Sequence, residues 1–124
     1  MANELVLIVE DNPKNLKLVR DTLQVKGYQT VEAETGEEGV RLAHERHLAL
    51  ILMDIQLPGI SGIEVLRRLR ADPVTRPTPV IAITASVMTQ DTKRIMAAGF
   101  DGFHGKPISV RQLLATVREI LDKP

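Results

Sequence analysis

A chain of 124 residues, 44% of them hydrophobic, is long enough to bury a substantial core, and we expect one domain over residues 1–124. Sixteen basic residues balance sixteen acidic residues, so no net charge draws the chain to nucleic acid or to an anionic membrane. The absence of cysteine, and of an apolar run long enough for a signal peptide or a bilayer span, predicts a cytoplasmic protein.

Short apolar runs alternate with segments of helical spacing along the chain. Strands are expected where apolar or β-prone residues are bounded by turn residues: 5–9, 28–33, 49–53, 80–83 and 102–105. The spacing predicts helices between and after them: 13–26, 36–46, 63–71, 88–98 and 110–121. The first helix begins at Pro13, with Asn12 or Asp11 as its cap, and Ser109 caps the last. The glycine-rich run 102–105 is the weakest strand.

The stretch from Ala49 to Gly62 organises the rest of the chain. Five apolar or small residues run without a helical period into Asp54, and the turn formers Pro58 and Gly59 follow, with Gly62 as a third. A run that is apolar on both faces is typical of a strand inside a parallel sheet, and periodicity alone leaves a buried helix segment as the alternative. Ligand sites of open α/β sheets lie beyond the carboxyl ends of such strands, which places Asp54 where chemistry is expected.

The short connections predict an α/β fold with parallel strands, right-handed crossovers and helices on both faces of the sheet. The carboxyl ends of all strands then share one edge of the sheet. Polar residues from four separate regions of the chain are expected to meet at that edge: Glu10, Asp11, Asp54, Thr84 and Lys106.

Carboxylates within about 4 Å of one another repel by roughly 4 kcal/mol per pair at an effective dielectric constant of about 20. The cluster of Glu10, Asp11 and Asp54 must therefore protonate, move apart or bind a cation. Oxygen ligands without cysteine or histidine favour magnesium or manganese over zinc. A carboxylate flanked by a hard cation, the Thr84 hydroxyl and the Lys106 ammonium can accept a phosphoryl group, with Asp54 as the nucleophile. Taken singly, each of these residues is more often a turn, capping or solvated residue, and only their joint placement favours phosphoryl chemistry.

The three histidines are assigned no catalytic role. His44 and His47 lie three residues apart on a predicted helix without a third ligand, so we expect an exposed polar face rather than a metal site. His104 lies inside the predicted strand 102–105, where a hydrogen-bonded, partly buried side chain is expected rather than a catalyst or a pH sensor.

The segments LIVEDN, ILMDIQLPGISG, VIAITA and KPIS resemble the receiver domains of bacterial two-component response regulators. They occur in the order and spacing of that family, and the match covers essentially the whole chain. The resemblance implies a flavodoxin-like fold, a doubly wound sheet of five βα units with strand order 2-1-3-4-5. It also implies a signalling domain that turns over no external substrate.

The resemblance implies a role for each matching acidic residue. Asp54 matches the aspartate that takes a phosphoryl group from the phosphohistidine of a histidine kinase or a histidine phosphotransferase. Glu10 and Asp11 match the acidic pair that holds Mg²⁺ together with Asp54, with Mn²⁺ as the alternative ion. The backbone carbonyl of Gln56 matches a further metal ligand.

The remaining matches concern the response to the phosphoryl group. Lys106 and Thr84 match the residues that contact the phosphoryl oxygens, and Phe103 matches an aromatic residue that swings inward when the threonine moves. The Lys106–Pro107 peptide bond is expected to be cis, as in the family. A downstream partner is expected on the face built from three segments: 88–98, 102–105 and 110–121.

Finer features of the sequence concern its subgroup. The segments DIQLP and KPIS are closest to stand-alone receivers that resemble the cell-division regulator of alphaproteobacteria. His104 and Gly105 depart from the family, which more often has apolar residues at these strand positions. The chain is expected to be a monomer or a weak dimer, and it is either a complete protein that signals by contact alone or a domain of a longer one.

Three alternative functions share either the fold or the phosphoryl chemistry. A magnesium-dependent phosphatase also forms an aspartyl-phosphate, but such enzymes resemble a pattern of two aspartates one residue apart, whereas Ile55 and Gln56 follow Asp54. A flavin-binding module shares the fold, yet Glu10 and Asp11 stand in place of a phosphate-cradling loop, and aromatic residues are scarce. The third alternative is a receiver that stores phosphate without any output.

Overall fold

The computed structural model describes residues 4–85 and 89–121. Within these residues the strands are β1 (Leu5–Val9), β2 (Gln29–Ala33), β3 (Leu50–Asp54), β4 (Val80–Thr84) and β5 (Gly102–Gly105). The helices are α1 (Pro13–Val25), α2 (Gly36–Glu45), α3 (Gly62–Ala71), α4 (Thr89–Ala98) and α5 (Val110–Leu121). Every predicted element is present, with ends that differ by no more than one residue. The predicted start of the fourth helix at residue 88 lies outside the described residues.

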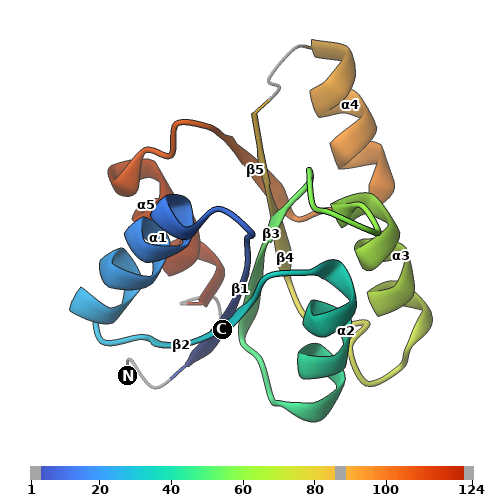
Figure 1. Ribbon diagram of the computed structural model, residues 1–124, viewed down its shortest axis with the longest axis horizontal. Helices are drawn as coiled ribbons and strands as arrows, with labels where there is room; N and C mark the ends of the chain where they lie inside the picture. Colours follow the sequence, from blue (N-terminus) through green and yellow to red (C-terminus); the bar gives the residue numbers. More distant parts are fainter. Residues whose placement is uncertain (1–3, 86–88, 122–124) are drawn as a thin grey trace.

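The strands form one parallel sheet in the order β2-β1-β3-β4-β5, which confirms the predicted α/β fold and its strand order. Helices α1 and α5 cover one face of the sheet, and α2, α3 and α4 cover the other (Figure 1). Strands β1 and β3 are neighbours, and Val9 pairs with Met53 near their carboxyl ends. The acidic residues after β1 and at the end of β3 therefore start from adjacent points on one edge.

Strand β3 is buried along its whole length, and none of its residues is more than 2% exposed. Its side chains alternate between the two faces of the sheet. Ile51 and Met53 join the core beneath α2, α3 and α4, while Leu50 and Leu52 join the core beneath α1 and α5. Because each fully buried aliphatic side chain contributes about 1.5–3 kcal/mol, Asp54 extends from a strand that both cores hold in place.

Helix α1 begins at Pro13, as predicted, and its cap is Asn12 rather than Asp11. The Asn12 side chain accepts hydrogen bonds from the backbone N–H groups of Lys14 and Asn15, at 2.9 and 3.2 Å. These bonds satisfy two of the N–H groups that a helix leaves unpaired at its start. The Asp11 carboxylate consequently takes no part in the cap.

Gly62, which the sequence suggests as a turn residue, is instead the first residue of α3. A Cβ atom at this position would lie 2.8 Å from the Asp54 carbonyl oxygen and 2.9 Å from Ile55 Cα. Only glycine lets α3 approach the end of β3 this closely. Gly59 is a turn residue as predicted, with φ +78°. The loop after Asp54 is thus held against the strand by a close backbone contact.

Candidate functional site

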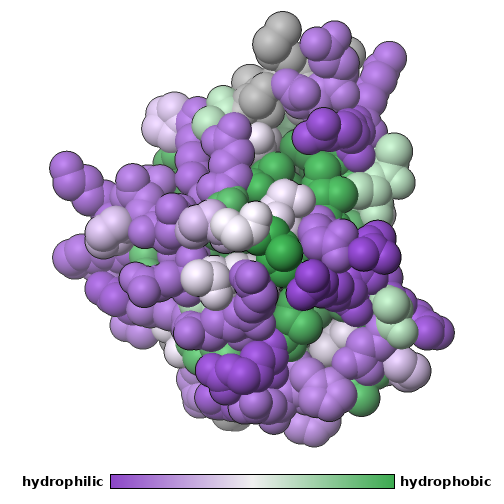
Figure 2. All heavy atoms as spheres, turned by 45° about the vertical axis from the view of Figure 1, so that its right-hand side comes forward, coloured by the Kyte–Doolittle hydropathy of each residue, from purple (hydrophilic) through white to green (hydrophobic). Residues whose placement is uncertain are grey.

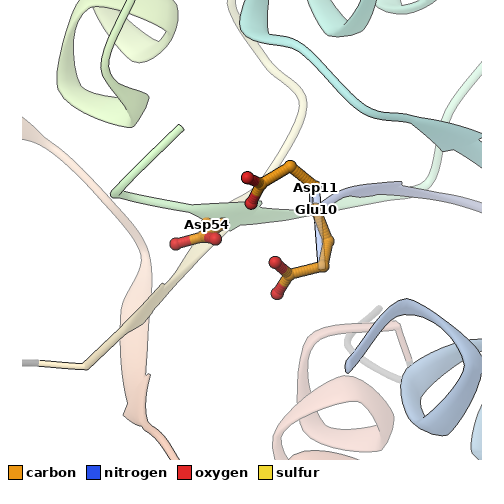
Figure 3. A group of neighbouring side chains, drawn as sticks. All are labelled: Glu10, Asp11 and Asp54. Atoms are coloured by element: carbon orange, nitrogen blue, oxygen red, sulfur yellow. The ribbon is translucent and has the colours of Figure 1, made fainter. Parts of the chain in front are cut away.

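Three carboxylates meet at the carboxyl edge of the sheet. Glu10 and Asp11 follow β1, Asp54 ends β3, and one oxygen from each lies within 4.8 Å of the others. Figure 3 shows the three side chains extending from the two neighbouring strands into a shared space. Glu10 and Asp54 are buried, at 3% and 2% exposed, whereas Asp11 is exposed. The predicted acidic cluster is therefore formed, and no second such group of acidic or histidine side chains occurs among the residues that the structure describes.

Both carboxylate oxygens of Asp54 accept hydrogen bonds. Oδ1 accepts from the backbone N–H of Gln56 at 3.0 Å, and Oδ2 accepts from Lys106 Nζ at 3.1 Å. Hydrogen bonds to an ionised group are stronger than bonds between neutral groups, so these contacts fix the direction of a nearly inaccessible carboxylate. The Asp54 side chain is thereby presented to the shared space in a fixed orientation.

Lys106 also reaches Glu10, a contact that sequence reasoning missed. Its Nζ atom lies 3.2 Å from Glu10 Oε1 and so bridges the ends of β1 and β3 from beyond β5. Burial alone lowers the pKa of the Lys106 ammonium, but the Asp54 and Glu10 carboxylates more than offset it and raise the pKa above its ordinary value. The Lys106–Pro107 bond is cis, as predicted, and Lys106 N–H donates to the Thr84 carbonyl at 2.8 Å.

Glu10 is the group whose titration the site changes most clearly. Burial raises the pKa of its carboxyl to about 7, and the neighbouring Asp54 side chain adds to the increase. The backbone N–H of Asn12, which donates to Glu10 Oε2 at 3.1 Å, and the Lys106 ammonium act in the opposite direction. The metal-free cluster therefore responds to crowding partly by holding a proton near neutral pH.

We expect the metal-free protein to lose stability as the pH rises from about 4.5 to about 7. In that window the folded state keeps a proton on Glu10 that the unfolded chain releases, so the free energy of unfolding falls as the pH rises. The Glu10 contribution is on the order of 3 kcal/mol. Urea denaturation with a chelator, compared between the wild type and Glu10→Gln across this range, measures it. Identical pH profiles for the two proteins would show that Glu10 titrates normally.

Thr84 ends β4 and is buried, at 2% exposed. It lines a cleft of about 530 Å³ together with the loop after Asp54, the start of α3, and the α4 residues Asp91, Arg94 and Ile95. Figure 2 views the side of the molecule that carries α2, α3 and α4, where apolar atoms lie exposed between polar surfaces. The sequence did not indicate this cleft, because it depends on how far α4 stands from α3.

Phe103 lies apart from the carboxylate cluster, on the edge strand β5, and is 36% exposed. It pairs in register with Ala82, which belongs to the core beneath α2, α3 and α4, so Phe103 lies on the α4 side of the sheet. Gln56, two residues after Asp54, contacts it through its backbone N–H, and the role of its carbonyl as a metal ligand stays a prediction. The structure thus gathers the acidic residues and Lys106 closely, with Thr84 at the end of β4 and Phe103 on β5, three residues before Lys106.

The histidines behave largely as the sequence predicts. His104 is partly buried, and its Nε2 atom lies 2.8 Å from Thr116 Oγ1 on α5. His47 is exposed, while His44 Nδ1 lies 2.7 Å from an Asp72 carboxylate oxygen in the loop after α3. The His44 contact ties α2 to that loop, and neither His44 nor Asp72 belongs to the acidic cluster.

The sequence model of the response regulator receiver domain family matches residues 6–118. This span includes every candidate site residue described above. The chain belongs to this family. Receiver domains are signalling domains of two-component systems rather than classical enzymes, and they interact with histidine kinases and downstream proteins. The predicted resemblance is therefore confirmed.

Individual receiver proteins resemble the chain over nearly its full length. The polar-differentiation response regulator DivK of Brucella ovis is 47% identical over 94% of both chains. The DivK protein of Brucella anthropi is 46% identical over the same share of each. This similarity confirms the subgroup that the DIQLP and KPIS segments indicate.

Solved receiver structures share the fold. The receiver domain of the sensor histidine kinase PA1611 from Pseudomonas aeruginosa superposes with a TM-score of 0.91 at 30% identity, covering 98% of this chain and 100% of that one. That receiver has a magnesium ion coordinated in its active site cleft. Chemotaxis protein CheY4 of Vibrio cholerae superposes with a TM-score of 0.89 at 28% identity, covering 97% of this chain and 100% of that one. No helix in the described part of the chain is long and apolar enough to cross a membrane.

Proposed function

We propose that this receiver domain accepts a phosphoryl group on Asp54 from a histidine kinase or a histidine phosphotransferase. The observation that carries the proposal is the buried Asp54 carboxylate, fixed by Lys106 and the Gln56 N–H at the centre of the acidic cluster. An oxygen of Asp54 attacks phosphorus, the phosphorus–nitrogen bond of the phosphohistidine breaks, and the electron pair of that bond returns to the imidazole. The product is an aspartyl-phosphate on this chain.

Lys106 has two tasks in this proposal. Before transfer, its ammonium offsets part of the repulsion between Glu10 and Asp54, which would otherwise disfavour two buried anions. During transfer, the same ammonium lies close enough to Asp54 to contact an oxygen of the incoming phosphoryl group. Thr84, at the end of the neighbouring strand, is proposed to donate its hydroxyl to another phosphoryl oxygen.

The acidic residues fit a hard divalent cation. Glu10, Asp11 and Asp54 offer carboxylate oxygens within 4.8 Å of one another, which are the donors that Mg²⁺ prefers, with Mn²⁺ as the alternative. We propose that these residues hold the ion together with the Gln56 backbone carbonyl. When bound, the ion supplies positive charge to the phosphoryl oxygens in the transition state. The magnesium ion in the PA1611 receiver supports the proposal at the level of the family.

The output is proposed to occur on the face formed by α4, β5 and α5, with residues 1–124 acting as one receiver domain. Thr84 pairs with Gly105 in register, so displacement of Thr84 toward a phosphoryl group acts directly on β5, which carries Phe103. Phe103 is part-exposed on the edge strand, and an inward movement would bury it further. A shift between mostly inactive and mostly active populations requires about 5.5 kcal/mol of differential binding, which several charge-assisted contacts can supply.

Phe103→Ala is expected to leave labelling of Asp54 nearly unchanged and to weaken phosphorylation-dependent binding of a downstream partner. The reason is that Phe103 lies outside the carboxylate cluster but on the proposed output face. Amide chemical shifts recorded with and without beryllofluoride, a phosphoryl mimic, provide the measurement. If the wild-type shifts stayed within the Asp54 loop and left α4, β5 and α5 unmoved, the protein would be a phosphate store without output.

Incubation with acetyl phosphate and Mg²⁺, followed by intact mass measurement, tests the proposed function. One phosphoryl group per chain is expected with Mg²⁺, and none when a chelator replaces the metal. A rate that does not depend on the metal would remove the proposed role of the acidic cluster. Continuous release of phosphate from many donor molecules at high rate would favour a phosphatase over a signalling receiver.

A further inference from the structure

His104 has no role in the proposed function, although it lies two residues before Lys106. Phe103 and His104 point to opposite faces of β5, because side chains alternate along a strand. Phe103 lies on the α4 side, so His104 lies on the α5 side, where its Nε2 atom is 2.8 Å from Thr116 Oγ1. The hydrogen bond therefore joins the strand that ends at the phosphoacceptor site to the last helix.

The surroundings of this hydrogen bond are apolar. Thr116 lies on α5 between Leu113 and Val117, which are at most 1% exposed and belong to the core beneath α1 and α5. On the strand side, His104 pairs in register with Ile83, which is also buried. Both partners are themselves partly buried, so the hydrogen bond is a specific polar link between β5 and α5 beside this apolar core.

Two side-chain hydrogen bonds, joined by the β5 backbone between His104 and Lys106, connect Asp54 to Thr116. Lys106 Nζ donates to Asp54 Oδ2 at 3.1 Å, and the Lys106 backbone N–H donates to Thr84 at 2.8 Å. His104 lies on β5, two residues before Lys106, and its side chain is hydrogen-bonded to Thr116 on α5. We propose that His104 and Thr116 form a positioning contact that couples the Lys106 end of β5 to α5, so that the state of Asp54 changes the environment of this helix. The proposal rests on the proposed function of Asp54.

The His104–Thr116 hydrogen bond is a contact between neutral groups. Burial lowers the pKa of His104, so the imidazole is neutral at neutral pH and carries one N–H. The charged side chains of α5, Arg111, Arg118 and Glu119, are exposed, and Lys106 is the nearest charge on its own segment. Because the imidazole and the Thr116 hydroxyl can each donate or accept, their hydrogen bond can be rebuilt or broken when β5 shifts. The titration of His104 therefore reports on the contact.

The first measurement is the titration of the histidine side chains by NMR, in the wild type, with and without beryllofluoride and Mg²⁺. The midpoint of His104 is expected to move on addition of beryllofluoride. His44 and His47, which lie on α2 and just after it, are internal controls and are expected to keep theirs. This measurement needs no substitution, so it stands even if a variant folds poorly. An unchanged His104 midpoint would overturn the coupling.

The second measurement compares Thr116→Val, which keeps the shape but removes the hydroxyl, with Thr116→Ser, which keeps the hydroxyl. Beryllofluoride-induced displacements of the amide signals of α5 are expected to be mostly lost in Thr116→Val and retained in Thr116→Ser. Displacements around Asp54 are expected to persist in both. If α5 moved as much in Thr116→Val as in the wild type, the coupling alone would be wrong. If the signals around Asp54 did not move even in the wild type, the proposed function would fail, and the coupling with it.

Discussion

Asp54→Asn is expected to abolish labelling of the protein by acetyl phosphate. Asparagine keeps the size of the side chain but cannot act as an anionic nucleophile. Glu10 and Asp11 are not expected to take over, because the backbone N–H of Gln56 is directed at Asp54 and burial raises the pKa of the Glu10 carboxyl. Intact mass after incubation with Mg²⁺ should show only the unmodified chain.

Asp21→Asn is the matched control for this experiment. Asp21 lies on α1, its side chain is 48% exposed, and it pairs with Lys17 and Arg20 rather than with the acidic cluster. The control should be labelled at the wild-type rate. A phosphoryl group found on Asp54→Asn would assign the nucleophile to another carboxylate of the cluster.

Lys106→Met is expected to slow labelling by about 10²–10³-fold, the usual effect of removing one preorganised donor from a charge-stabilising site. Methionine has a similar length but neither the charge nor the donors of lysine, so the phosphoryl oxygens lose a partner. The rate of labelling at saturating Mg²⁺ is the quantity to measure. Lys14→Met, at an exposed position at the start of α1, is the control and should leave the rate unchanged.

Magnesium binding separates a loss of chemistry from a loss of fold in Lys106→Met. In the wild type, the ammonium lies 3.2 Å from Glu10 and 3.1 Å from Asp54, where it competes with a cation for the same oxygens. Removing it should therefore preserve or tighten Mg²⁺ binding while labelling falls. A variant that bound Mg²⁺ and was labelled within a few-fold of the wild-type rate would contradict the role proposed for Lys106.

The fold and the acidic cluster follow from local sequence features. The strand before Asp54 is apolar on both faces and stops at turn residues, and a sheet of alternating β and α segments brings the ends of its strands to one edge. Once β1 and β3 are placed side by side, Glu10 and Asp11 must approach Asp54. The predicted site is therefore a consequence of topology more than of any single motif.

The contacts that differ from prediction depend on the three-dimensional packing of side chains and backbone. Lys106 follows the edge strand β5, whereas Glu10 follows β1, and two other strands lie between them in the sheet. No local sequence pattern therefore indicates the bridge between these two side chains. Gly62 is required by the approach of α3 to the backbone of β3, whereas in the sequence it has the same appearance as a turn glycine. The signal that could have indicated the bridge was the single ammonium placed beside three carboxylates.

The most direct test of the central claim is to locate the modified residue after labelling with acetyl phosphate and Mg²⁺. Borohydride reduces an aspartyl-phosphate to homoserine with release of phosphate, and peptide mass spectrometry then identifies the converted position. Conversion is predicted at residue 54 alone, and only when Mg²⁺ is present during labelling. Homoserine at residue 11, hydroxynorvaline (the corresponding product of a glutamyl-phosphate) at residue 10, or a phosphoryl group on a histidine or hydroxyl side chain would contradict the assignment of Asp54 as the phosphoacceptor.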